Sequence, residues 1–133
     1  MKVLDLVKVC RYTPITKNDI NSFGNVPVYS QSIDKIEGYT ENLAKSIEGP
    51  AIIFGDHTST CNYVEGIFCV TPNCKVLKND KAINCDLYYL YTYVQHKLKR
   101  NFTGDYGRHF KIIKEMEIPI HNLKDQITIG SFP

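Results

Sequence analysis

Ala51-Ile52-Ile53-Phe54-Gly55-Asp56-His57-Thr58 is the stretch of sequence that decides the fold. The apolar residues Ala51 to Phe54 stand between two turn-forming segments, Gly49-Pro50 and Gly55 onward. A short continuous apolar run with turn residues at both ends is typical of a buried strand. The polar residues that follow predict a loop from Gly55 to Thr60, which this strand would present at the surface.

The triplet Asp56-His57-Thr58 has three interpretations. A catalytic role is one, because His is the usual acid–base group at neutral pH, but such a role also needs a positioned nucleophile and an orienting group. A second is that His57 faces DNA and forms hydrogen bonds with it. A third is a solvated loop whose Asp56 stabilises its own turn.

The composition predicts one domain, residues 1–133, with an ordinary hydrophobic fraction of 43% and 23% charged residues. No apolar run approaches the roughly 20 residues that span a membrane. Asp5 interrupts the region where a signal peptide would be apolar, so we expect a cytosolic protein without membrane contact. The formal net charge is only +2. A DNA-binding role therefore requires basic groups gathered on one face, or a partner that supplies them.

Motifs of catalysis and metal binding are missing from the sequence. Five cysteines stand at irregular spacing without a Cys-x-x-Cys pair, which predicts free, half-buried thiols and no metal. Phosphate-binding and dinucleotide-binding glycine motifs, zinc-protease and serine-hydrolase motifs, and the motifs of adenine methyltransferases and nucleases do not occur. We expect no cofactor and no catalytic residue.

Secondary structure is predicted to be mixed α/β (α+β), with more strand than helix. Turn formers predict a loop from Thr13 to Asn25. Gly38 to Glu41 predicts a short helical turn capped by Thr40. Pro27 favours a sheet edge for its strand. The predicted strands, beyond the buried one, are Val3–Val9, Val26–Ser30, Asn62–Val70 and Cys74–Leu77.

One main helix is predicted near residues 85–100. Apolar residues recur there at three- and four-residue steps; they are Leu87, Leu90, Tyr91, Val94 and Leu98. Asn84 is the expected N-cap, with Asp86 in the first turn and cations in the last. A second short helix is expected from Phe110 to Met116, followed by an extended segment, Glu117 to Ile120.

The most basic stretch runs from His96 to Lys114, and its only acid is Asp105. It also carries aromatic residues around a glycine loop, namely Phe102, Tyr106 and Phe110. Interleaved basic and aromatic residues can hold phosphates and stack on bases. The alternative is a charged helix end followed by a solvated loop.

Taken in order, these pieces resemble the target-recognition domain of type I restriction enzyme specificity subunits, from about Leu4 to Gln126. Each motif is short, and the resemblance depends on their order and spacing. The matching segments are Pro14–Ile20, Val26–Tyr29, Gly38–Thr40, Ile52–Thr58, Gly66–Val70, Leu87–Leu90, Gly104–Phe110 and Ile118–Ile120 with Gln126.

The chain departs from the family pattern at two points. His121 stands where the family commonly has a second proline. The 133 residues also include neither a spacer helix nor a second recognition domain. Three interpretations follow: half of a bipartite specificity unit, a domain excised from a longer protein, or a stand-alone relic. The first of these would pair with another copy or with a second recognition domain.

The resemblance implies sequence-specific recognition of double-stranded DNA, with catalysis left to a partner adenine methyltransferase and to restriction subunits. Arg108 is the first choice for a base or phosphate contact. Asp56 would accept a hydrogen bond from cytosine N4 or orient His57. Contacts to the sugar–phosphate backbone of DNA would come from Lys97, Lys99 and Arg100. The implied DNA-binding residues are Tyr39, Thr40, Asp56, His57, Thr58, Lys97, Lys99, Arg100, Tyr106, Arg108 and His109.

Two other classes of function remain. One is a protein-interaction or structural relic of the same fold without DNA binding, which the low net charge favours. The other is a small metal-dependent nuclease, which would lose activity when Asp56 or His57 is replaced. The dependence of DNA binding on salt separates the first alternative from a DNA reader.

Overall fold

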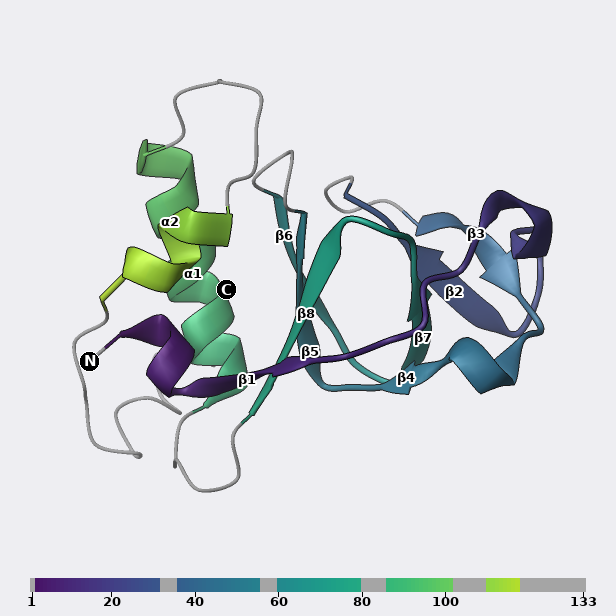
Figure 1. Ribbon diagram of the computed structural model, residues 1–133, viewed down its shortest axis with the longest axis horizontal. Helices are drawn as coiled ribbons and strands as arrows, with labels where there is room; N and C mark the ends of the chain where they lie inside the picture. Colours follow the sequence, from purple (N-terminus) through teal and green to yellow (C-terminus); the bar gives the residue numbers. More distant parts are fainter. Residues whose placement is uncertain (1, 32–35, 56–59, 80–85, 102–109, 118–133) are drawn as a thin grey trace.

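Strand β5 (Ala51–Gly55) is an inner strand of the sheet on which the helices pack, as its apolar run predicts. The computed structural model describes residues 2–31, 36–55, 60–79, 86–101 and 110–117 (Figure 1). All five residues of β5 are buried. Its Ile53 lies opposite Asn62 on one neighbouring strand and Val76 on the other. The prediction of a buried strand is confirmed.

The sheet around β5 has four antiparallel strands in the order β1-β8-β5-β6. Its other members are β1 (Val7–Cys10), β6 (Thr60–Val64) and β8 (Cys74–Asn79). The chain reaches β1 through a 3-10 helix, Val3–Asp5, so the predicted strand Val3–Val9 is wrong in its first half. Val3 is fully buried there, which explains the misleading apolar pattern.

A second sheet has the strand order β3-β2-β7-β4. Its members are β2 (Val26–Tyr29), β3 (Ile36–Thr40), β4 (Ile47–Glu48) and β7 (Ile67–Val70). Strand β2 pairs antiparallel with β3 and parallel with β7, so the predicted edge position of this strand is wrong. The pairing with β7 involves only Val28 and Tyr29. Pro27 therefore lies outside the part of β2 that is paired on both sides, which is why its missing N–H is tolerated.

Three further predictions are corrected between Thr13 and Val70. The segment Gly38 to Thr40 belongs to strand β3, and a 3-10 helix follows only at Leu43–Lys45. The predicted strand Asn62–Val70 is two strands in different sheets, divided at Gly66, whose φ of +78° suits a glycine. The predicted loop before β2 contains a 3-10 helix, Lys17–Asp19.

Helix α1 (Leu87–Asn101) and helix α2 (Phe110–Glu115) are present where the sequence predicts helices. The N-cap of α1 is Asp86, because its Oδ1 accepts a hydrogen bond from the Tyr89 backbone N–H at 2.9 Å. The predicted N-cap Asn84 lies outside the described residues. Of the extended segment predicted from Glu117 to Ile120, only Glu117 is described, and it forms an isolated bridge with Lys2.

Side chains alternate across β5 and bury both of its faces. Ile52 and Phe54 face the helices, where they join Leu90, Val94 and Ile113 in one core. Ala51 and Ile53 face the second sheet, in a core that also includes four residues of its neighbours and of β7; they are Val64, Phe68, Val70 and Val76. Figure 1 shows the resulting arrangement, with the helices at one end, the β5 sheet in the middle and the second sheet at the other end.

Four cysteines are free and at least partly buried, as predicted: Cys10, Cys61, Cys69 and Cys74. Burial raises the pKa of the Cys61 thiol to about 12, so this thiol is inert at neutral pH. Cys85 lies outside the described residues. Within the described part of the chain, no helix is both long and apolar enough to cross a membrane.

We predict that Phe54→Ala lowers the free energy of unfolding by about 3–5 kcal/mol, because it leaves a cavity where a fully buried ring stood. Phe23→Ala is the matched control, since Phe23 is 82% exposed and should change stability by less than about 0.5 kcal/mol. Urea unfolding followed by circular dichroism measures both. Should Phe54→Ala prevent folding, Phe54→Leu provides a milder change. Equal losses for Phe54 and Phe23 would contradict the central role of β5.

Candidate nucleic-acid interface

The end of β5, which precedes segment 56–59, lies against the start of α2, which follows segment 102–109. Phe54, near the end of β5, and Phe110, at the start of α2, have ring centroids 5.8 Å apart and planes tilted by 44°. Both rings are buried. Because aromatic pairs of this geometry pack tightly, the contact fixes the start of α2 against the end of β5. We call this part of the molecule the Phe110 edge, defined by Phe54, Phe110 and the lysines described next.

Two lysines from different elements hold their ammonium groups over the Phe110 ring. Lys75 Nζ, from β8, lies 5.5 Å from the ring centroid, and Lys114 Nζ, from α2, lies 5.7 Å from it. Lys75 lies directly opposite Phe54 in the sheet register. The sequence analysis did not single out Lys75. The signal it left was a cation within the apolar run Cys74 to Leu77, on the same strand face as Leu77.

Most of the predicted DNA-binding residues fall outside the described part of the chain. Lys97 is described, and its Nζ lies 5.6 Å from the centroid of the Tyr93 ring. Tyr93 in turn donates a hydrogen bond to the Glu117 carbonyl at 2.7 Å. The positions outside the described residues are Asp56, His57, Thr58, Tyr106, Arg108 and His109, together with the side chains of Lys99 and Arg100.

Tyr39 and Thr40 lie on β3 in the second sheet, away from the Phe110 edge (Figure 1). Thr40 is only 2% exposed, and its Oγ1 accepts a hydrogen bond from the Asn42 backbone N–H at 3.1 Å. This geometry gives Thr40 a structural role in the turn after β3, which does not fit direct contact with DNA. Tyr39 is half-buried, and its backbone exchanges hydrogen bonds of 2.7 and 2.9 Å with Asn21.

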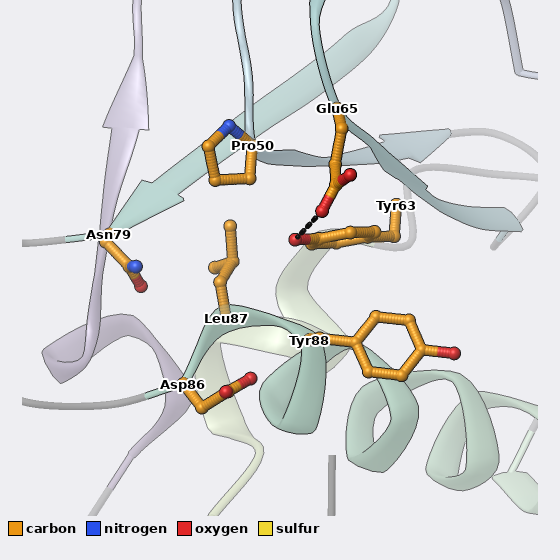
Figure 2. Close-up of a pocket in the computed structure, with 7 residues that line it drawn as sticks. All are labelled: Pro50, Tyr63, Glu65, Asn79, Asp86, Leu87 and Tyr88. Atoms are coloured by element: carbon orange, nitrogen blue, oxygen red, sulfur yellow. Dashed lines mark hydrogen bonds between the residues drawn. The ribbon is translucent and has the colours of Figure 1, made fainter. Parts of the chain in front are cut away.

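A pocket of about 740 Å³ lies at the opposite end of β8 from Lys75. Figure 2 shows its lining, with the Tyr63 hydroxyl donating a hydrogen bond of 3.2 Å to Glu65. The Tyr63 and Tyr88 rings meet edge to face at 5.1 Å. The lining residues are Pro50, Tyr63, Glu65, Asn79, Asp86, Leu87 and Tyr88.

The described lining of this pocket carries two acidic side chains, Glu65 and Asp86. Burial, the hydrogen bond to Glu65 and the carboxylates of Glu65 and Asp86 together raise the pKa of Tyr63 to about 12. Among the described residues, the lining has two carboxylates and no lysine or arginine, and such a surface repels phosphate. The pocket therefore does not suit a nucleic-acid backbone, whereas the Phe110 edge has the opposite charge.

Metal binding has no support in the described part of the chain. Within those residues, no group of three or more His, Cys, Asp or Glu side chains could hold a metal ion.

Comparison with known proteins identifies the family of the chain. The family model for the type I restriction modification DNA specificity domain matches residues 1–132. The chain belongs to this family. The resemblance noted in the sequence is thereby confirmed. No curated protein matches the sequence.

Solved structures show that this specificity domain has a known fold. An S subunit of a type I restriction–modification system from M. genitalium is similar, with a TM-score of 0.78 and 17% identity over 98% of the chain. A chain from a structure that describes complex assembly and conformational transition of the type I R-M system has a TM-score of 0.74 and 11% identity over 99% of this chain. An HsdS subunit from Thermoanaerobacter tengcongensis has a TM-score of 0.70 and 13% identity, also over 99% of this chain. The chain spans 36%, 36% and 35% of those three chains, and the likeness confirms the predicted fold class.

We predict that Gly38→Ala destabilises the domain by about 1–3 kcal/mol, because the second sheet has no room for a side chain at this position. An added Cβ would lie 2.7 Å from the Asn21 carbonyl oxygen and 2.5 Å from Ile20 Cγ2. Relief of the clash would break the two hydrogen bonds between Asn21 and Tyr39. The urea midpoint measures the effect, and a variant as stable as the parent protein would contradict the packing described here.

Proposed function

We propose that this chain reads the base sequence of double-stranded DNA as one recognition domain of a type I restriction–modification system. One observation carries the proposal: the Phe54–Phe110 contact brings the end of β5, which precedes segment 56–59, against the start of α2, which follows segment 102–109. These two segments hold most of the side chains that the sequence assigns to DNA. Family membership supports the same function.

The chemistry of the two segments suits base recognition. Arg108 carries a planar fork that can bind guanine O6 and N7 or a phosphate. Asp56 can accept a hydrogen bond from cytosine N4, and His57 and His109 can donate or accept. Tyr106 offers a ring face and a hydroxyl. Lys97, Lys99 and Arg100, in the last turns of α1, supply positive charge for the DNA backbone.

Catalysis belongs to partner subunits in this proposal. The chain acts as a single recognition domain over residues 1–133, without a cofactor, in the cytosol where its DNA is. An adenine methyltransferase that binds the same DNA flips and modifies the target base. A second recognition domain, or a second copy of this chain, reads the other half of a split site.

In vitro selection from a library of random duplexes tests the proposal directly. We expect the full chain, with and without a candidate adenine methyltransferase, to enrich a motif of about three to five base pairs. Binding should weaken steeply as salt rises. If neither preparation enriches a motif and duplex binding is absent even at low salt, the fold has kept no DNA-reading function and the relic alternative holds.

We predict that Arg108→Ala reduces discrimination at one base pair of the selected site by about 1–3 kcal/mol, which is roughly 5- to 150-fold. Arg11→Ala is the matched control. Arg11 is exposed in the segment that follows β1, and its replacement by Ala removes the same charge. Gel shifts on the selected duplex and on its single-base variants measure the effect. Identical base preferences for the parent protein and Arg108→Ala would exclude Arg108 from base recognition.

A further inference from the structure

Lys75 and Lys114 share a buried ring but come from different elements. Their ammonium groups lie 5.5 and 5.7 Å from the Phe110 centroid, and the ring itself is only 8% exposed. Lys75 is half-buried on β8, and Lys114 is exposed on α2. The aliphatic stems therefore cover the ring while the charged ends reach the surface.

The two charges have no carboxylate partner among the described residues. In that part of the chain, the ion pair found is Lys45 with Asp19, at 3.3 Å, and neither Lys75 nor Lys114 takes part in another. A cation–π contact attracts an ammonium group without neutralising it. Within the described residues no carboxylate pairs with either ammonium group, so both can bind an anion from outside the molecule.

The geometry points to Lys75 and Lys114 as contacts to the phosphate backbone of duplex DNA. This inference rests on the proposed function, and it adds a sequence-independent part of the binding surface that lies entirely within the described fold. Phosphate contacts set the position of a protein on the duplex, while base contacts give specificity. The contacts with the Phe110 ring place both ammonium groups close to the end of β5 and the start of α2. From that position they would help to set where the protein lies on the duplex.

A purely structural role for the two lysines makes a different prediction. In that case the stems would stabilise Phe110, and the charges would be irrelevant to DNA. Lys→Met keeps most of the stem and removes the charge, and Lys→Arg keeps the charge. Comparison of these variants separates packing from phosphate binding.

The test is the salt dependence of duplex binding by the full chain, measured by fluorescence anisotropy between 50 and 200 mM salt on the selected duplex and on a random one. Each phosphate contact adds about 0.9 to the slope of log K against log salt. When salt rises fourfold, the affinity of the parent protein falls by some factor. We expect that factor to be about 3.5 times smaller for Lys75→Met and for Lys114→Met. For the two changes together it should be about 12 times smaller.

Lys78→Met is the matched control. Lys78 is on the same strand as Lys75, three residues further along and on the opposite face, where it lies across from Lys8 of β1. The Lys78→Met substitution removes the same net charge without altering the Phe110 edge. We expect a parent-like slope for Lys78→Met, a parent-like slope for Lys75→Arg, and equal effects of each Lys→Met change on the selected and random duplexes.

The outcomes distinguish this inference from the proposed function. If the parent protein binds duplex and the Lys75→Met and Lys114→Met slopes equal that of Lys78→Met, the phosphate assignment is wrong while the proposed function stands. If the parent protein binds no duplex at any salt concentration, the proposed function fails and the inference fails with it. Thermal unfolding confirms that the variants compared are folded.

Discussion

The need to bury both faces of β5 constrains the whole structure. A strand with apolar side chains on both faces is stable only when two layers cover it, and each fully buried large side chain contributes roughly 1.5–3 kcal/mol. The helices cover Ile52 and Phe54, and the second sheet covers Ala51 and Ile53. The three-layer order of the described residues follows from this one segment.

The same burial connects the fold to the candidate interface. Phe54 is at once a core residue and the partner of Phe110, so the packing that stabilises β5 also positions α2. Recognition segments need rigid support, because contact with a base edge depends on small displacements. At the other end of β8, the described residues around Tyr63 include the carboxylates of Glu65 and Asp86 instead of lysines.

Local patterns in the sequence were sufficient for some elements and misleading for others. The run Ala51 to Phe54 and the stripe along α1 are signals of burial, and burial decides these elements. Thr40 has the side chain of a helix cap, and it does cap a turn, but hydrogen bonds from distant Asn21 hold its neighbours in a strand. Propensity is a weak guide where tertiary pairing competes with it.

The candidate interface was harder to predict than the fold. The order of motifs indicated the family, and the basic stretch indicated one group of cations. Lys75 was missed because its partner Phe110 is 35 positions away, and only the packing of β8 against α2 brings them together. Pro27 is a similar case. The preference of proline for a sheet edge can be applied from the sequence alone, whereas how far β2 pairs with β7 depends on the tertiary structure.

The first and last described residues meet on the helix side of the molecule. The Val3 N–H donates to the Met116 carbonyl at 2.9 Å, and Lys2 forms a bridge with Glu117. A unit whose two ends are adjacent can be carried within a larger chain without a change in its own packing. The part of the fold between Lys2 and Glu117 could therefore be exchanged as a cassette, because a replacement with adjacent ends would leave the chain on either side at the same separation.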